Sequence, residues 1–204
     1  MKYEIIPSDE TIKKVSLALH ARNVTTIIVD TKEEALEEIK KLIPKGAEVM
    51  NGSSTTLKEA GFMDYLGGDA NGWDNVHAKI TSEKDPVVHA KLRKESVLAD
   101  YFLGSVHAIT EEGQLLIASG SGSQVPSYAF TSNNVIWVAS ANKIVADLDG
   151  AFDRLKNYVY PLEDKRMKSV GYPGSTIGKI LIFEREIVPT RKLTMILVKE
   201  KLGF

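Results

Sequence analysis

Cysteine is absent from all 204 residues of the sequence. Disulfide bonds, thiolate nucleophiles and cysteine-bound zinc or iron–sulfur clusters are therefore excluded within this chain. Histidine is scarce as well: its four positions are 20, 77, 89 and 107, and no two of them share the short spacing of a zinc site. We therefore expect no metal site in this chain.

Aromatic residues, an excess of charge and long hydrophobic runs are also lacking. Aromatic residues make up 7% of the chain, and 26 basic residues balance 27 acidic ones. We expect no nucleic-acid partner, because neither a basic footprint nor a stacking platform stands out. No run of about 18 apolar residues is present to cross a membrane, and the first residues lack the apolar core of a secretory signal. We expect a cytoplasmic protein with no membrane partner.

The two common nucleotide-binding fingerprints are missing too. Counting from Gly120, the sixth residue is Val125, where a dinucleotide-binding turn needs Gly or Ala. No GxxxxGK[ST] sequence occurs, so a Walker-type site is excluded. Together with the missing cysteines, this predicts that the chain carries no bound cofactor and no redox centre of its own.

What is present is an alternation of amphipathic helices and short apolar strands. Ile12, Val15 and Leu19 form one face of a helix after Ser8, and a second helix begins at Thr31. Strands at 25–29 and 47–50 separate these helices, and TTIIV at 25–29 is apolar enough for a central parallel strand. We predict one Rossmann-like α/β domain over residues 1–204, with a mainly parallel sheet and helices on both faces.

The middle of the chain predicts an inserted β-hairpin. Residues 101–110 are typical of a strand, 111–113 of a turn and 114–118 of a returning strand. We expect this hairpin to project from the sheet or to lie at its edge. Before it, residues 67–85 form a polar excursion whose role stays open, and Pro86 begins a helix. Further elements are expected as strands at 135–139, 179–183 and 193–198 and as a helix that Asp147 opens.

Two turns rich in glycine and hydroxyl groups are the most informative stretches. Residues 51–56, NGSSTT, connect an apolar strand to a helix, and residues 120–123, GSGS, follow another strand. The free N–H groups of a helix start suit a phosphate or carboxylate. The alternative is that Ser53 or Ser54 only caps the helix, with Thr56 and Glu59 as a capping box. Because ligands bind at the carboxyl ends of parallel strands, we expect the two turns to line one pocket.

Acid–base groups between the two turns are weak catalytic candidates. They are Asp100, His107 and Glu111. A carboxylate beside a phosphate cradle is what an aldose–ketose isomerase needs to move a proton next to a carbonyl. Each also has a plain structural interpretation: Asp100 as a turn residue, His107 as a packed strand residue and Glu111 as a solvated hairpin tip.

Five segments spread over nearly the whole chain carry a family resemblance. They are 51–57, 99–113, 120–123, 141–145 and 192–204, of which ADYFLGSVHAITEEG at 99–113 and ANKIV at 141–145 are the most specific. In these segments the chain closely resembles the LUD, or lactate-utilisation, family (DUF162). The resemblance implies a fold similar to the superfamily of glucosamine-phosphate isomerase, ribose-phosphate isomerase and coenzyme A transferase.

The resemblance also implies a role in oxidising lactate to pyruvate beside iron–sulfur partner proteins. It supplies no catalytic residues to carry over. Many relatives carry cysteines in the segment that corresponds to 170–179, where this chain has none, so a metal or redox role tied to them does not transfer. His107 stands where relatives often have Asn. The turns and the family blocks together give the predicted ligand-binding residues: Asn51, Gly52, Ser53, Ser54, Thr55, Gly104, Ser105, Gly120, Ser121, Gly122, Ser123, Asn142 and Lys143.

Two functions remain open at this level. The first is a subunit or accessory factor for lactate oxidation that binds a small anionic metabolite, while iron–sulfur oxidoreductase subunits carry the electrons. The second is a stand-alone sugar-phosphate isomerase or coenzyme A-transferase-like enzyme. The sequence leaves the substrate and the oligomeric state undetermined, with a homo-oligomer among the possibilities.

Overall fold

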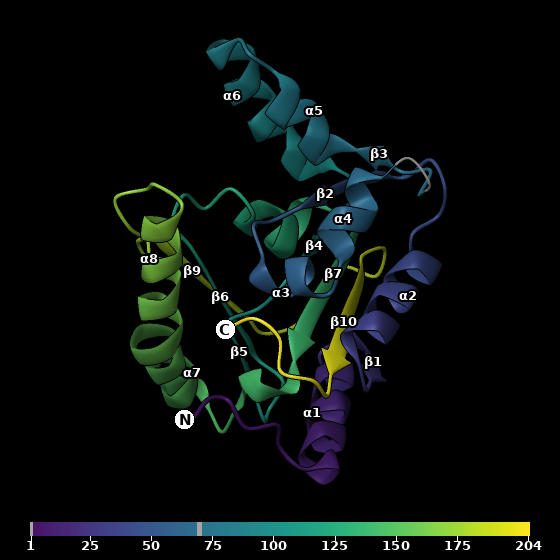
Figure 1. The fold of residues 1–204 in the computed structure, drawn as a ribbon. Coiled ribbons are helices and arrows are strands. Elements are labelled where there is room, and N and C mark those ends of the chain that lie inside the picture. Colours follow the sequence, from purple (N-terminus) through teal and green to yellow (C-terminus); the bar gives the residue numbers. More distant parts are fainter. Residues whose placement is uncertain (1, 69–70) are drawn as a thin grey trace.

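The computed structural model describes residues 2–68 and 71–204, and its larger sheet is parallel throughout (Figure 1). In spatial order its strands are β1 (Thr25–Val29), β10 (Lys192–Val198), β7 (Asn134–Ser140), β4 (Tyr101–Gly104), β2 (Glu48–Asn51) and β3 (Asp74–Asn75). All of these neighbours pair in parallel register. The predicted Rossmann-like α/β fold is confirmed.

A second, smaller sheet packs against the first. Its strands, in spatial order, are β8 (Ile144–Val145), β5 (Ala108–Thr110), β6 (Leu115–Ser119) and β9 (Lys179–Phe183). The β5–β6 and β6–β9 pairs are antiparallel, whereas β8 runs parallel to β5. The expected inserted hairpin is present as β5–β6. Its predicted place was wrong: it neither projects from the parallel sheet nor lies at its edge, because it forms the middle of this second sheet.

Helices connect and cover the strands. In chain order they are α1 (Asp9–Ala21), α2 (Lys32–Leu42), α3 (Thr55–Glu59), α4 (Phe62–Gly67), α5 (Val76–Ser82), α6 (Pro86–Glu95), the 3-10 turn η1 (Ser96–Leu98), the π-helical turn η2 (Ser127–Thr131), the 3-10 turn η3 (Ala141–Lys143), α7 (Leu148–Arg154), the π-helical turn η4 (Leu155–Val159) and α8 (Tyr160–Ser169). The predicted helix starts are capped as expected: Ser8, Thr31 and Asp147 accept the N–H groups of Thr11, Glu34 and Gly150.

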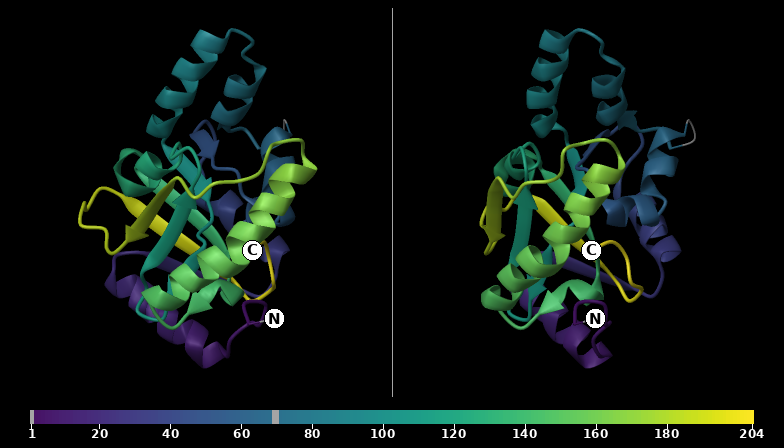
Figure 2. Two further views of the ribbon diagram at one scale, coloured as in Figure 1. Left: turned by 90° about the vertical axis from the view of Figure 1, so that its left-hand side faces the viewer. Right: turned by 60° about the vertical axis from the view of Figure 1, so that its left-hand side comes forward.

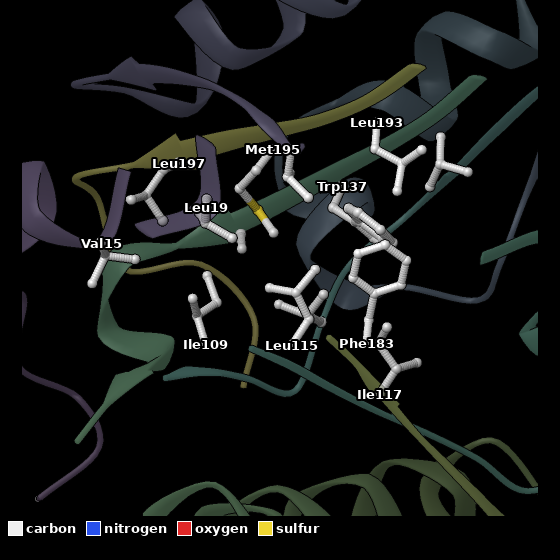
Figure 3. Packing of buried hydrophobic residues seen from close by; sticks show 14 of the residues in the cluster. Val15, Leu19, Ile109, Leu115, Ile117, Trp137, Phe183, Leu193, Met195 and Leu197 are labelled. Atoms are coloured by element: carbon white, nitrogen blue, oxygen red, sulfur yellow. The ribbon is translucent and has the colours of Figure 1, made fainter. Parts of the chain in front are cut away.

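Three hydrophobic clusters bind the layers together. One face of the parallel sheet packs on α2, α3 and α4. The other face packs on α1 and on the second sheet, where Trp137 and Met195 meet Leu115 and Phe183 (Figure 3). The far side of the second sheet packs on α7 and η4, which α8 continues as one helix (Figure 2). Each strand of the parallel sheet alternates its side chains between the two faces.

Two sequence predictions about strands are wrong. Strand β1 is an edge strand of the parallel sheet rather than a central one. Its apolar character arises because α1 and α2 flank it, and Ile28 still remains 39% exposed. Residues 101–110 are not one strand: β4 ends at Gly104 in the large sheet, and β5 begins at Ala108 in the small one. Both pieces are buried on both faces, and the Gly104–Ser105 pair between them marks the break.

The stretch after β3 extends away from the sheets. Helices α5 and α6 project from the top of the molecule (Figure 1), and α6 buries none of its residues. The predicted excursion at 67–85 contains α5, and residues 69–70 of it lie outside the described part. Within the described residues, no helix combines the length and the apolar character that crossing a bilayer requires.

Candidate functional site

A cavity of about 650 Å³ opens where β2 and β4 end, beside the last residues of β6. This volume suits a small metabolite, since ligand sites commonly fall between about 300 and 1,000 Å³. The cavity is walled on one side by the 51–56 turn and on another by residues 118–124. The helix η4–α8 and the segment 170–177 close a third side. The two turns singled out in the sequence therefore share one cavity.

Lys143 is the most unusual residue of this cavity. Its side chain is only 2% exposed, although it lines the wall. The Nζ atom donates to Thr56 Oγ1 at 3.0 Å, Ser105 Oγ at 3.0 Å and the Val106 carbonyl at 3.1 Å. No carboxylate in residues 2–68 and 71–204 forms an ion pair with it. Burial, followed by the positive charge of Arg154, lowers the pKa of Lys143 to about 7, and Glu59 opposes this.

His107 stands in the same wall as a neutral imidazole. Its Nδ1 accepts the N–H of Ala118 at 3.0 Å, so the ring proton is assigned to Nε2. Burial, followed by the charges of Lys143 and Arg154, lowers the pKa of His107 to about 3. The imidazole is therefore uncharged at physiological pH, and its Nε2–H remains as a hydrogen-bond donor in a residue that lines the cavity.

Arg154 lies behind this wall and is fully buried. One of its Nη atoms donates to the His107 carbonyl, and its guanidinium lies 5.2 Å from the centre of the Tyr158 ring. Its Nε and Nη2 atoms have no hydrogen-bond partner within the described residues. Burial lowers the pKa of Arg154 to about 10, so it stays charged at neutral pH. Lys143 and Arg154 thus place two buried cationic groups near each other without a carboxylate between them.

The 51–56 turn is shaped by its neighbours. Ser54 caps α3 by accepting the Leu57 N–H at 3.2 Å. The Glu59 carboxylate instead accepts the Gly203 N–H at 2.7 Å, so the alternative capping box does not form. A Cβ atom at Gly52 would lie 2.3 Å from Gln124 Oε1, so a larger residue there would require the Gln124 side chain to move. The turn therefore approaches residue 124 closely, and this brings the two glycine-rich turns together.

The 120–123 turn is tied to α6 across the cavity mouth. Arg93 Nη2 donates to Ser121 Oγ at 3.2 Å and to Ser123 Oγ at 3.4 Å. Ser119 Oγ accepts the Gly122 N–H at 3.0 Å and fixes the turn. Arg93 lines the cavity, and no acidic residue of the described chain forms an ion pair with it. Its guanidinium adds a positive charge at the solvent side of the cavity.

The wall opposite Lys143 comes from α8 and the segment after it. Arg166 and Glu163 form a two-point ion pair, with N–O distances of 2.6 and 2.7 Å, and both line the cavity. Asp164 accepts the Ser175 N–H at 2.9 Å and holds the cysteine-free segment 170–179 against the helix. Since Glu163 neutralises Arg166, Arg93 and Lys143 are the cations of the cavity that have no acidic partner among the described residues.

The comparison with protein families decides what kind of domain this is. The family model of the LUD domain matches residues 12–191. The chain belongs to the LUD family. A crystal structure of a DUF162 family protein from Deinococcus radiodurans is similar to it, with a TM-score of 0.50 and 14% sequence identity over 94% of this chain and 99% of that one. At that identity the likeness concerns the fold alone. A comparison with curated proteins found no match.

Most predicted ligand-binding residues of this LUD domain reach the cavity. Those that line it are Asn51, Gly52, Ser53, Ser54, Thr55, Ser105, Gly120, Ser121, Ser123 and Lys143. Three others do not. Gly104 lies beneath it, where a Cβ atom would be 1.7 Å from Tyr128 Oη. Gly122 forms the turn with a φ of 84°, and Asn142 donates to the Tyr3 carbonyl at 3.2 Å. These three shape the LUD domain around the site.

Of the three catalytic candidates, His107 alone lies in the cavity wall. Asp100 precedes β4 and is therefore at the opposite end of that strand; its carbonyl accepts the Asn134 N–H at 3.0 Å. Glu111 follows β5, which begins at the cavity and runs away from it, and it pairs with Lys14 at 2.6 Å. Their plain structural interpretations hold, because strand direction separates both carboxylates from the cavity.

Sequence reasoning missed Arg93, Arg154 and the Glu163–Arg166 pair. All four side chains sit on helices, where charged residues usually face solvent. Arg154 carried one signal: it falls on the apolar side of the 148–159 helix, next to Leu155. A charged residue within the buried stripe of a helix is uncommon, and it therefore indicates a candidate functional residue.

Proposed function

We propose that this LUD domain binds a small anionic metabolite, a carboxylate or a phosphate ester, in the cavity at Lys143. The observation that carries the proposal is a buried lysine without a carboxylate partner among the described residues, in a cavity of metabolite size. A buried cation is costly unless it is paired. An anionic ligand supplies the missing charge, and its binding raises the fraction of protonated Lys143.

The surroundings of Lys143 fit such a ligand. Hydroxyl groups of Ser53, Thr55 and Ser105 line the same cavity and offer neutral donors to anionic oxygens. The Nε2–H of His107 adds a further donor. Arg93 at the mouth attracts an anion from solution and can contact a second charged group of the ligand. We place the charged end of the metabolite between the hydroxyl turns and Lys143.

We further propose a role in the oxidation of lactate to pyruvate, in the cytoplasm, as a subunit or accessory factor. Membership of the lactate-utilisation family supports this role. Lactate and pyruvate are small carboxylates and fit the charge of the site. Electron transfer is assigned to iron–sulfur partner proteins, because this chain has no cysteine to hold a cluster.

A thermal-shift screen tests the binding. Lactate, pyruvate, sugar phosphates and coenzyme A are added to the purified protein, with lactamide as the uncharged analogue of lactate. Occupancy at about 100 times the dissociation constant stabilises the native state by about 2.7 kcal/mol, or roughly 5–10 °C for a chain of this length. We expect at least one anion to give such a shift, and lactamide to give none. Equal shifts with lactate and lactamide, or no shift with any anion, would contradict the proposal.

A second candidate function is an isomerase or a coenzyme A-transferase-like enzyme. The observation that favours it is the amine of Lys143, which is held near neutrality beside two hydroxyls and is thus able to move protons at pH 7. Conversion of a sugar phosphate by the isolated chain, with loss of turnover in Lys143→Met, would favour this enzyme over the accessory role.

A further inference from the structure

Two hydroxyl groups touch the Lys143 amine, and they differ in access. Thr56 is 2% exposed, and Gly203 is packed so closely on it that a Cβ atom there would lie 2.3 Å from Thr56 Oγ1. Ser105 is half-buried and lines the cavity at the point where β4 ends. Thr56 also borders the cavity, but its side chain is almost fully covered, so a molecule in the cavity meets the Ser105 hydroxyl first.

We propose that Ser105 and Lys143 form a nucleophile–base dyad that takes an acyl group from an ester or thioester of a small acid. The Ser105 Oγ to Lys143 Nζ distance is 3.0 Å, which is within hydrogen-bond reach. Thr56 Oγ1 and the Val106 carbonyl fix the amine from two other directions. This is the arrangement of a serine nucleophile, an amine base and a group that orients the base.

The base must be neutral at working pH, and the surroundings of Lys143 provide this. The charged and titratable groups around it are Arg154, His107 and Glu59. Burial and Arg154 favour the neutral amine, and Glu59 opposes them. The resulting pKa of Lys143, about 7, leaves roughly half of the amines with a free electron pair at neutral pH.

The step balances without any further reactant. Ser105 Oγ forms a bond to the acyl carbon, and its proton passes to Lys143 Nζ. The bond from the acyl carbon to the leaving oxygen or sulfur breaks, and Lys143 returns the proton to that leaving group. Water then cleaves the acyl-serine by the same route. His107 lies in the same wall, two residues after Ser105 in the sequence. Its Nε2–H is available to donate to the oxygen of the acyl group, which becomes negative during the attack.

This activity goes beyond the proposed metabolite binding but uses the same cavity. An anion bound at Lys143 favours the charged amine and occupies the approach to Ser105. Anionic metabolites should therefore slow the reaction of Ser105. The two proposals can be refuted separately. If the protein binds anions but Ser105 does not react, the dyad is refuted and the metabolite site stands. If Ser105 reacts but no anion binds, the metabolite site is refuted and the dyad stands.

The test uses a fluorophosphonate probe, which reacts irreversibly with activated serines. Intact mass and peptide mapping of the full chain should show one adduct at Ser105. Ser105→Ala should abolish this adduct, and Lys143→Met should slow it roughly 100-fold or more, the usual contribution of a positioned base. The exposed Ser82→Ala and Lys13→Met variants serve as matched controls and should be labelled like the wild type. Thr56→Val should slow labelling, and Thr56→Ser should restore it.

The wild-type protein alone supplies a second measurement, should Lys143→Met fail to fold. Its labelling rate should rise about tenfold per pH unit up to about pH 7 and then level off, as deprotonation of Lys143 requires. A folded wild type that is not labelled at Ser105, labelling spread over other serines, or a pH-independent rate would each overturn the dyad. Equal labelling of the wild type and Lys143→Met would do the same.

Discussion

Replacing Arg191 by Met is expected to lower the free energy of unfolding by about 3–5 kcal/mol, as breaking a buried ion pair does. Arg191 is 7% exposed and pairs with Glu186, which is 5% exposed. Its guanidinium also donates to the carbonyls of Ser127, Tyr128, Ala129 and Ser132, at distances of 3.0–3.2 Å. The substitution leaves Glu186 Oε2 and four carbonyls without the guanidinium donor.

The loss of Arg191 should also affect the candidate site, because the four carbonyls belong to η2 or directly follow it. This turn carries Tyr128, whose hydroxyl packs against Gly52 and Gly104 below the cavity. Chemical denaturation at pH 7 measures the loss. The double variant Glu186→Gln/Arg191→Met removes the unpaired charge of the Glu186 carboxylate and should recover part of the lost free energy of unfolding. The exposed Arg185→Met serves as control and should stay within about 0.5 kcal/mol of the wild type. A loss below about 1 kcal/mol for Arg191→Met would show that the pair does not hold η2.

The second large effect concerns the pH dependence of stability in Lys143→Met. The pKa of Lys143 is about 7 in the folded chain, against an ordinary value of 10.5. Between these pH values the unfolded chain binds a proton that the folded chain lacks, so the stability of the wild type rises with pH. The variant lacks this contribution. The free energy of unfolding of the wild type minus that of Lys143→Met should therefore increase by about 1.4 kcal/mol for each pH unit above about pH 7. Below about pH 7 this difference should change little.

Denaturation curves at several pH values between 6 and 9 measure this difference. Groups present in both proteins, such as Glu59 and Arg154, largely cancel in the comparison. Lys13→Met removes an exposed amine and should show no pH-dependent difference from the wild type. A constant difference between the wild type and Lys143→Met across this range would mean that the lysine is charged in the folded protein like any other.

The fold was predictable where its signals are local. Ser8 and Thr31 cap their helices as expected, and Ile12, Val15 and Leu19 are the buried stripe of α1. The division of 101–110 between two sheets leaves only a weak signal in the sequence. Phe102, Leu103, Ala108 and Ile109 are all buried, and the Gly104–Ser105 pair and His107 interrupt the apolar residues where the chain changes sheets. Periodicity reports burial along a strand and does not report which sheet the strand joins.

The site was predictable in part, for a related reason. The turn residues Gly52 and Gly120 follow strands, and the rule that ligands bind at carboxyl ends placed them together. Lys143 entered the prediction through the family resemblance alone. Its burial depends on Thr56, Ser105 and Val106, which lie far from it in sequence and meet it only through the packing of the two sheets. Arg93 lay on a helix that resembled an ordinary charged helix, and Arg154 gave only the signal of a charged residue within an apolar stripe.

The most direct test of the anion site is a calorimetric titration with the carboxylate that gives the largest thermal shift, at pH 6 and pH 8.5. A carboxylate ligand keeps its charge over this range, and the Lys143→Met variant separates the contribution of Lys143 from that of His77, which also lines the cavity. We expect the affinity of the wild type to fall roughly tenfold or more between these values, as Lys143 loses its proton. Lys143→Met should bind more weakly at pH 6 and show no such fall, while Lys13→Met should match the wild type. Equal affinities in the wild type and Lys143→Met at both pH values would contradict an anion site at Lys143.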